Sequence, residues 1–113
     1  MFQVRSLQKK SSTVCAALLL LALLFVQSCV TMPAPVLEYT LADTALKAAK
    51  AVQAVRYSPT NWHDAEETYR RAQILFNERE YEQARDLFIR ARIAAEKAET
   101  SARIIRQRNG EVL

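Results

Sequence analysis

The sequence predicts an all-α protein, in which a small antiparallel three-helix bundle, or a helical hairpin with a preceding helix, follows an N-terminal signal peptide. Two observations support this prediction. The chain opens with a basic segment and a short apolar run, which is typical of a secretory signal peptide. The rest of the chain carries apolar residues at spacings of three and four, which is the period of an amphipathic helix. We therefore expect a signal peptide over 1–28, a tether over 29–36 and a helical domain over 37–113.

The signal peptide is predicted from its apolar run, which spans the thirteen residues 14–26 and is preceded by three basic residues and no acid. At about 1.5 Å per residue the run is only ~20 Å long, whereas the hydrocarbon core of a bilayer is roughly 30 Å thick. Pro33 and Pro35 stop a helix from extending the run further. Cleavage is therefore favoured over an uncleaved anchor, and a cleaved, plainly secreted protein remains a further alternative.

The end of the run, Val26-Gln27-Ser28-Cys29, resembles a bacterial lipobox. In that motif, signal peptidase cuts before a cysteine whose sulfur has received diacylglycerol. The apolar Val26 and the small Ser28 fit the motif, whereas Gln27 departs from it because that position usually holds a small residue. The resemblance implies that Cys29 is the first residue of the mature protein and its lipidation site, carrying diacylglycerol and fatty acyl groups such as palmitate.

The residue after Cys29 is Val30. In Gram-negative lipoproteins a residue other than aspartate at this position usually implies export to the outer membrane. The resemblance therefore implies anchoring at the periplasmic face of the outer membrane, with the inner membrane as the alternative. The prolines of the 29–36 tether favour extended backbone, so we expect helix to begin only at about Val36.

The charge of the mature chain excludes one class of partner. The full chain has a formal net charge of +4, with 16 basic and 12 acidic residues. Three of the basic residues lie in 1–28, so the mature domain keeps a net charge of only +1, and nothing indicates nucleic-acid binding. Without Cys15, Cys29 has no partner for a disulfide. With one histidine and no clustered ligands, no metal site and no cofactor is expected.

The first predicted helix spans 37–57. Its apolar stripe recurs at spacings of three and four, at Leu37, Leu41, Ala45, Ala48, Val52 and Val55. Residues 57–61 interrupt the stripe. Ser58 and Pro59 predict the start of the next helix, because serine is a preferred N-cap and proline fits the first helical position.

The second predicted helix spans 59–78, with its stripe at Trp62, Ala65, Tyr69, Ala72 and Phe76. The stripe then loses its phase and restarts at Tyr81. This break predicts a tight turn over 78–80, and the alternative is one continuous kinked helix.

The third predicted helix spans 81–108 and has the most regular pattern. Its seam alternates spacings of three and four, at Tyr81, Ala84, Phe88, Ala91, Ala95, Ala98, Ala102 and Ile105. Small seam residues let helices approach closely but bury little apolar area each. Antiparallel pairing with the second helix is expected to place Trp62 opposite Ala98–Ala102, and Asn109-Gly110 is expected to end the helix.

The segment from Glu80 through Tyr81, Ala84, Phe88 and Ala91 resembles the second half of a tetratricopeptide repeat. Thr68 and Arg71 stand where that repeat has Trp and Leu, and the chain holds one copy, whereas repeat arrays need about three. The resemblance implies a peptide-binding or chaperone-type module as the alternative function.

A second resemblance covers residues 40–105. It is carried by Ala48-Ala49-Lys50-Ala51, Ser58-Pro59, Ala65-Glu66, Tyr81-Glu82-Gln83-Ala84-Arg85 and Ala95-Glu96-Lys97-Ala98-Glu99. These elements resemble a family of Ala-rich helical-hairpin lipoproteins of bacterial envelopes, whose domain has no assigned function. The family also occurs fused ahead of peptidoglycan-binding domains, which implies work in the envelope. No catalytic residue can be transferred from it.

Titratable residues give no prediction of catalysis. His63 and Asp64 are adjacent, and adjacent residues on a helix do not face each other. The acidic residues around the 78–80 turn do not match the spacing of a calcium-binding loop. We therefore expect no enzyme activity.

Partner binding is expected on the third helix and at its end. The candidate residues are Ile93, Ile104, Ile105, Arg103, Arg106 and Arg108. The isoleucines suit a partner helix or self-association. The arginines suit an anionic polymer such as peptidoglycan or lipopolysaccharide, or simply complement the helix C-terminus. The aromatic stripe residues are expected in the core and not in a peptide groove.

These observations favour a non-enzymatic cell-envelope lipoprotein that acts as a structural or adaptor module in the periplasm. Its expected partners are the membrane, through Cys29, and other envelope proteins or further copies of itself.

Overall fold

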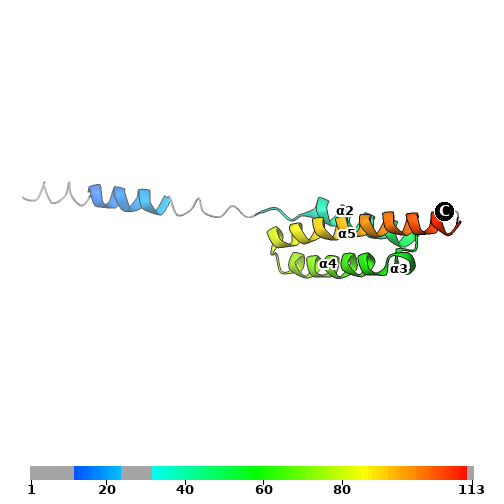
Figure 1. The fold of residues 1–113 in the computed structure, drawn as a ribbon. Coiled ribbons are helices and arrows are strands. Elements are labelled where there is room, and N and C mark those ends of the chain that lie inside the picture. Colours follow the sequence, from blue (N-terminus) through cyan, green and yellow to red (C-terminus); the bar gives the residue numbers. More distant parts are fainter. Residues whose placement is uncertain (1–11, 24–31, 112–113) are drawn as a thin grey trace, which may run out of the picture. The chain divides into compact units, whose positions relative to one another are not determined.

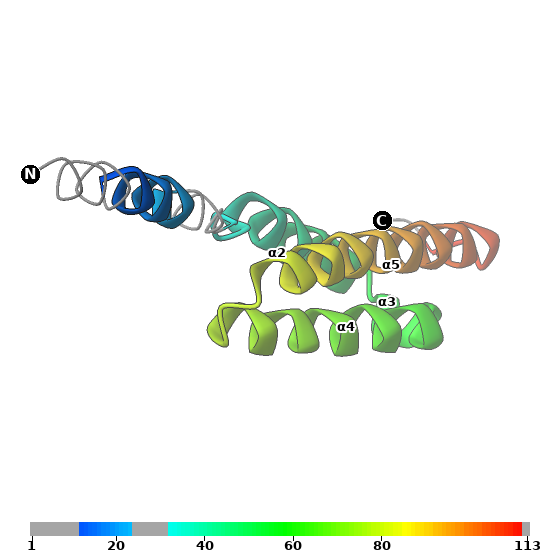
Figure 2. The ribbon, with the colours of Figure 1, turned by 90° about the vertical axis from the view of Figure 1, so that its left-hand side faces the viewer.

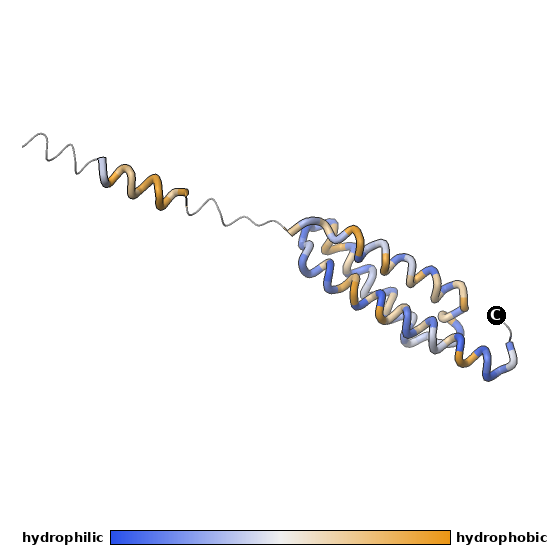
Figure 3. The backbone as a smooth tube through the Cα atoms, turned by 90° about the horizontal axis from the view of Figure 1, so that it is seen from above, coloured by the Kyte–Doolittle hydropathy of each residue, from blue (hydrophilic) through white to orange (hydrophobic). Residues whose placement is uncertain are grey.

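The computed structural model describes residues 12–23 and 32–111 of the chain. Outside these ranges lie the lipobox-like residues, including Cys29, and the start of the tether. The chain divides into two compact units, Met1–Thr31 and Met32–Leu113. In the described part of the chain the regular structure is helical, which confirms the all-α prediction. In the first unit, residues 12–23 are helical and mostly apolar, whereas apolar and polar residues alternate along the helices of the second unit (Figure 3).

The second unit contains α2 (Val36–Ala51), α3 (Ala54–Tyr57), α4 (Pro59–Asn77) and α5 (Tyr81–Arg108). The long helix α5 is the centre of this unit, because α4 and α2 both pack along it, whereas α2 and α4 meet each other mainly through aromatic side chains. α4 lies antiparallel to α5, and α2 lies parallel to it (Figures 1 and 2). The short α3 crosses between the ends of α2 and α4 beside the last turns of α5.

The prediction of one continuous helix over 37–57 is wrong in one respect. The structure breaks this segment into α2 and α3. Gln53 adopts a left-handed conformation with a φ of 62°, and its N–H donates to the Lys50 carbonyl over 3.0 Å. The break changes which residues face the core. Ala54 is fully buried, whereas Val55, which belonged to the predicted stripe, is 53% exposed. The turn thus puts α3 against the end of α5, where a straight helix would have continued past it.

The turn predicted over 78–80 is present. α4 ends at Asn77, and Arg79 takes a left-handed φ of 64°. The N–H of Glu80 donates to the Leu75 carbonyl over 2.9 Å, and that of Arg79 donates to the Phe76 carbonyl over 3.2 Å. This bonding is the Schellman pattern of a helix end. In that pattern glycine usually occupies the left-handed position.

The same pattern ends α5, where Gly110 has a φ of 74°. The N–H of Glu111 donates to the Arg106 carbonyl over 2.9 Å, and that of Gly110 donates to the Gln107 carbonyl over 3.1 Å. Gly110 therefore has the helix-ending role predicted for it. At the start of α4, Ser58 and Pro59 stand at the predicted positions, although the Ser58 hydroxyl accepts a hydrogen bond from the Asn61 side chain instead of one from the backbone.

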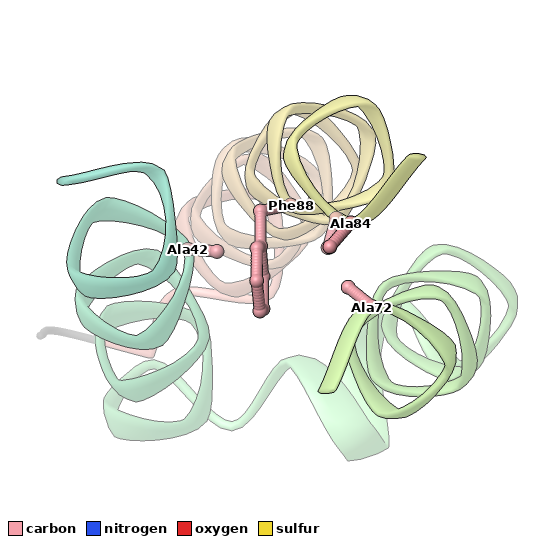
Figure 4. Packing of buried hydrophobic residues seen from close by; sticks show 5 residues of the cluster. Ala42, Ala72, Ala84 and Phe88 are labelled. Carbon is pink, nitrogen blue, oxygen red and sulfur yellow. The ribbon is translucent and has the colours of Figure 1, made fainter. Parts of the chain in front are cut away.

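The core of the second unit is built from alanine. Eleven of the thirteen buried apolar residues in the described part of the chain are alanines, and the other two are Val52 and Phe88. The helices can therefore approach closely, because an alanine methyl group takes up little space between two backbones. Phe88 is the largest side chain that is fully buried. It extends from α5 between Ala42 of α2 and Ala72 of α4 (Figure 4).

Aromatic rings surround Phe88 and fill the space between α2 and α4. The ring of Phe88 lies 5.3 Å from that of Tyr39, 5.7 Å from Tyr69 and 6.2 Å from Phe76, each pair in an edge-on arrangement. Such pairs contribute about 0.5–1.5 kcal/mol each beyond their buried area. At the other end of the bundle, Trp62 packs against the cluster that contains Ala98 and Ala102, as predicted.

Replacing Phe88 tests whether this ring holds the bundle together. Phe88→Ala should lower the free energy of unfolding by about 3–5 kcal/mol, because it leaves a cavity among side chains too small to fill it. Ile74→Ala, at an α4 residue that is 45% exposed, should change it by less than about 1 kcal/mol. The measurement is urea unfolding of the full chain in a non-ionic detergent, followed by circular dichroism. Equal losses for the two variants would contradict this account of the core.

The turn residue Arg79 gives a second test. A left-handed conformation costs a non-glycine residue roughly 1–2 kcal/mol. Glycine avoids this cost but destabilises the folded state by about 0.5–1 kcal/mol, because it loses more conformational entropy on folding. Arg79→Gly should therefore stabilise the protein by up to about 1 kcal/mol in the same unfolding measurement. The control is Glu78→Gly, at a residue with an ordinary φ of −76°. It should destabilise the protein, and a stabilising effect there would refute the explanation.

Candidate functional site

The isoleucines predicted to bind a partner are separated in the structure. Ile93 and Ile104 point outward from α5 and are 56% and 48% exposed. About three helical turns, roughly 16 Å, lie between them. Ile105 is half-buried, because α3 packs against the end of α5. These three residues therefore do not form one patch.

The predicted Arg106 belongs to a cluster that we call the C-terminal clasp, formed by Tyr57, Arg106 and Glu111. The Tyr57 hydroxyl donates to the Glu111 carboxylate. The Arg106 guanidinium lies 4.0 Å from that carboxylate and 5.8 Å from the centre of the Tyr57 ring. It also donates to the Val52 carbonyl over 3.4 Å. The Arg106 side chain is only 14% exposed, so it ties α5 to the α2–α3 break.

The hydrogen bond to Glu111 raises the pKa of Tyr57 above its usual value. A tyrosine hydroxyl is protonated at neutral pH, and the raised pKa extends its role as donor in the clasp to higher pH. The other two predicted arginines lie on the surface of α5. Arg103 donates to the Glu99 carboxylate over 3.0 and 2.8 Å, and Arg108 is exposed in the last turn. Basic residues there complement the negative end of the helix dipole.

The aromatic residues on the α2 side are bound to one another. The Tyr69 hydroxyl lies 3.5 Å from the Asp43 carboxylate. Burial, together with hydrogen bonding to Tyr39 and Asp43, raises the pKa of Tyr69 well above its usual range. Beside these rings is a shallow pocket of ≈ 310 Å³, lined by Tyr39, Gln73, Phe76 and Asn77. Tyr69 and Phe76 pack against the core cluster of Phe88, and Tyr39 contacts both rings from its exposed edge.

His63 and Asp64 do not form an acid–base pair. The His63 Nε2 atom lies 3.9 Å from the Glu67 carboxylate, one turn further along α4. Asp64 is exposed and faces the groove described below. Among the described residues, no group of three or more histidine, cysteine, aspartate or glutamate side chains is placed to hold a metal ion.

A groove that the sequence did not predict runs between α4 and α5. We call it the α4–α5 groove. It has a volume of ≈ 490 Å³ and is lined by Asp64, Thr68, Arg71, Leu87, Arg90, Ile93, Ala94 and Lys97. Only Ile93 belongs to the predicted binding residues. The available signal was the helical spacing of Arg90, Ala94 and Lys97, which puts them on one face of α5.

None of the helices in the described part of the chain is long and apolar enough to cross a membrane.

Comparison with known proteins assigns a family to most of the second unit. Residues 37–110 match the family described as domain of unknown function (DUF4398). No curated protein and no solved structure gives a significant match to the chain. The matched segment covers all but the first residue of the α2–α5 bundle, and it confirms the expectation of a helical domain without an assigned function. Since the match spans more than half of the chain, this protein belongs to the DUF4398 family.

Proposed function

We propose that the protein is a non-enzymatic lipoprotein of the cell envelope, anchored through Cys29, in which the α2–α5 bundle serves as a structural or adaptor module. The observation that carries the proposal is the apolar helix of the first unit. Its residues Val14, Leu18, Leu19, Leu20, Leu21 and Leu23 are all more than half exposed. Burying one such side chain is worth about 1.5–3 kcal/mol, so this helix favours a non-aqueous environment.

The sequence around the helix supports a lipid anchor over a spanning segment. The apolar run of 14–26 is about 20 Å long as a helix, which is short for a hydrocarbon core of roughly 30 Å. The lipobox-like residues that follow it offer Cys29 as the acyl acceptor. By the resemblance to Gram-negative lipoproteins, Val30 then favours the periplasmic face of the outer membrane as the site of anchoring.

The bundle itself supports a binding role over catalysis. Its polar clusters are engaged in holding helices together, as in the clasp, where Tyr57, Arg106 and Glu111 contact one another. A tetratricopeptide-like module that binds peptides through its aromatic stripe has less support. Phe88 is fully buried, and Tyr39, Tyr69 and Phe76 pack around it.

The intact mass of the membrane-extracted protein tests the anchor. The wild-type protein should have the mass of residues 29–113 plus acyl groups, because cleavage and lipidation act on the same cysteine. Cys29→Ala should show neither cleavage at this site nor added acyl mass. Cys15→Ala is the matched control, since it alters the other cysteine of the chain, and should be processed like the wild type. A full-length, unmodified wild-type mass would refute the lipoprotein proposal.

A further inference from the structure

The α4–α5 groove is lined by one face of each helix. Asp64, Thr68 and Arg71 follow one another at spacings of four and three on α4. On α5, the lining residues Leu87, Arg90, Ala94 and Lys97 are spaced three, four and three. No residue of α2 lines the groove. α2 therefore does not cover the groove, although its lining residue Leu87 also packs against the cluster that contains Phe88.

Antiparallel pairing sets the order of charges along the groove. Ala65 and Ala95 belong to one core cluster, so Asp64 lies toward the Lys97 end and Arg71 toward the Arg90 end. The lining carries three cations and one carboxylate. Arg71 is also 3.3 Å from the carboxylate of Glu67. Within the described part of the chain, neither Arg90 nor Lys97 forms an ion pair, and both side chains are exposed.

Apolar and small side chains lie between these cations. Leu87, Ala94 and Thr68 are half-buried in the groove, and Ile93 is exposed at its edge. Arg90 and Lys97 are seven residues apart, which is two helical turns or about 10 Å. The groove thus offers an apolar floor flanked by unpaired positive charges at a helical spacing.

We propose that the α4–α5 groove docks an acidic segment of a partner protein. Carboxylates of that segment pair with Arg90 and Lys97, and its apolar side chains pack on Leu87, Ile93 and Ala94. An acidic helix fits this arrangement, because carboxylates seven residues apart lie on one face two turns apart. Charge complementarity of this kind selects partners by sign. A second copy of the chain docked groove to groove would bring two net positive surfaces together, which argues against self-association here.

This inference rests on the proposed adaptor role, which supplies the partner, but it is tested apart from the lipid anchor. The probe is a fluorescent amphipathic peptide of leucine and glutamate, compared with the same peptide carrying glutamine for every glutamate. Fluorescence anisotropy measures its binding to the full chain in a non-ionic detergent. The groove variant is Arg90→Glu with Lys97→Glu. The matched control is Lys50→Glu with Arg70→Glu, which makes the same change in net charge at exposed residues outside the groove.

The groove variant should weaken binding of the acidic peptide at least tenfold, because it reverses both unpaired charges. The control should change the Kd by about twofold or less at physiological salt, because exposed charges outside the binding site are largely screened. The glutamine peptide should bind weakly to all three proteins. If circular dichroism shows that the groove variant is misfolded, Arg90→Gln with Lys97→Gln replaces it, with the same order of affinities expected.

Four results would overturn the proposal. Equal weakening in both variants would mean that net charge alone attracts the peptide. Unchanged binding in the groove variant, or equal binding of the glutamine peptide, would mean that the groove is not the acidic site. A dimer by sedimentation that the groove variant dissociates would mean that a second copy occupies it. The mass of the membrane-extracted protein is independent of all four results, so failure of this inference and failure of the lipid anchor are distinguishable.

Discussion

Contact between the alanine row of α5 and two flanking helices is the constraint on which the bundle depends. Ala84, Ala91, Ala95, Ala98 and Ala102 are fully buried, and each contributes one methyl group to the interface. So little area per residue stabilises the fold only if many residues take part. Accordingly, α5 has 28 residues and is longer than either α2 or α4. Alanine also has the highest helix propensity, so the same residues that permit close packing help the helix to form.

Because α2 packs on one side of α5 only and its rings meet those of α4 there, the two sides of the α4–α5 hairpin differ. On one side the gap between α2 and α4 is filled by large rings around Phe88, and stability is concentrated there. On the other side α2 does not line the seam, and within the described part of the chain Arg90 and Lys97 of the lining form no ion pair. A single helical scaffold thereby combines a closed aromatic face with an open cationic one.

The regular part of the sequence was enough to predict α5, its alanine seam and the turn before it. Apolar residues at strictly alternating spacings of three and four lie on one face of a single helix, and the pattern breaks at the turn. The apolar stripe of 37–57 gave a wrong prediction at its end, where Val55 was expected to face the core. Val55 and Ala54 are both apolar, and only the left-handed Gln53 decides which of them is buried. The α4–α5 groove was missed for another reason. Its residues come from two helices, and their juxtaposition depends on the pairing register, which no single stretch of sequence contains.

The C-terminal clasp has a mechanical consequence. In the second unit the chain enters at Met32–Pro35, near the Glu38–Arg85 ion pair at the start of α5, and the clasp holds Glu111 at the opposite end of the bundle (Figure 1). α2 and α5 are parallel, so tension applied between these two ends would slide one helix along the other. Their contacts would then be loaded together in shear along the whole seam, with α4 carrying little of the force.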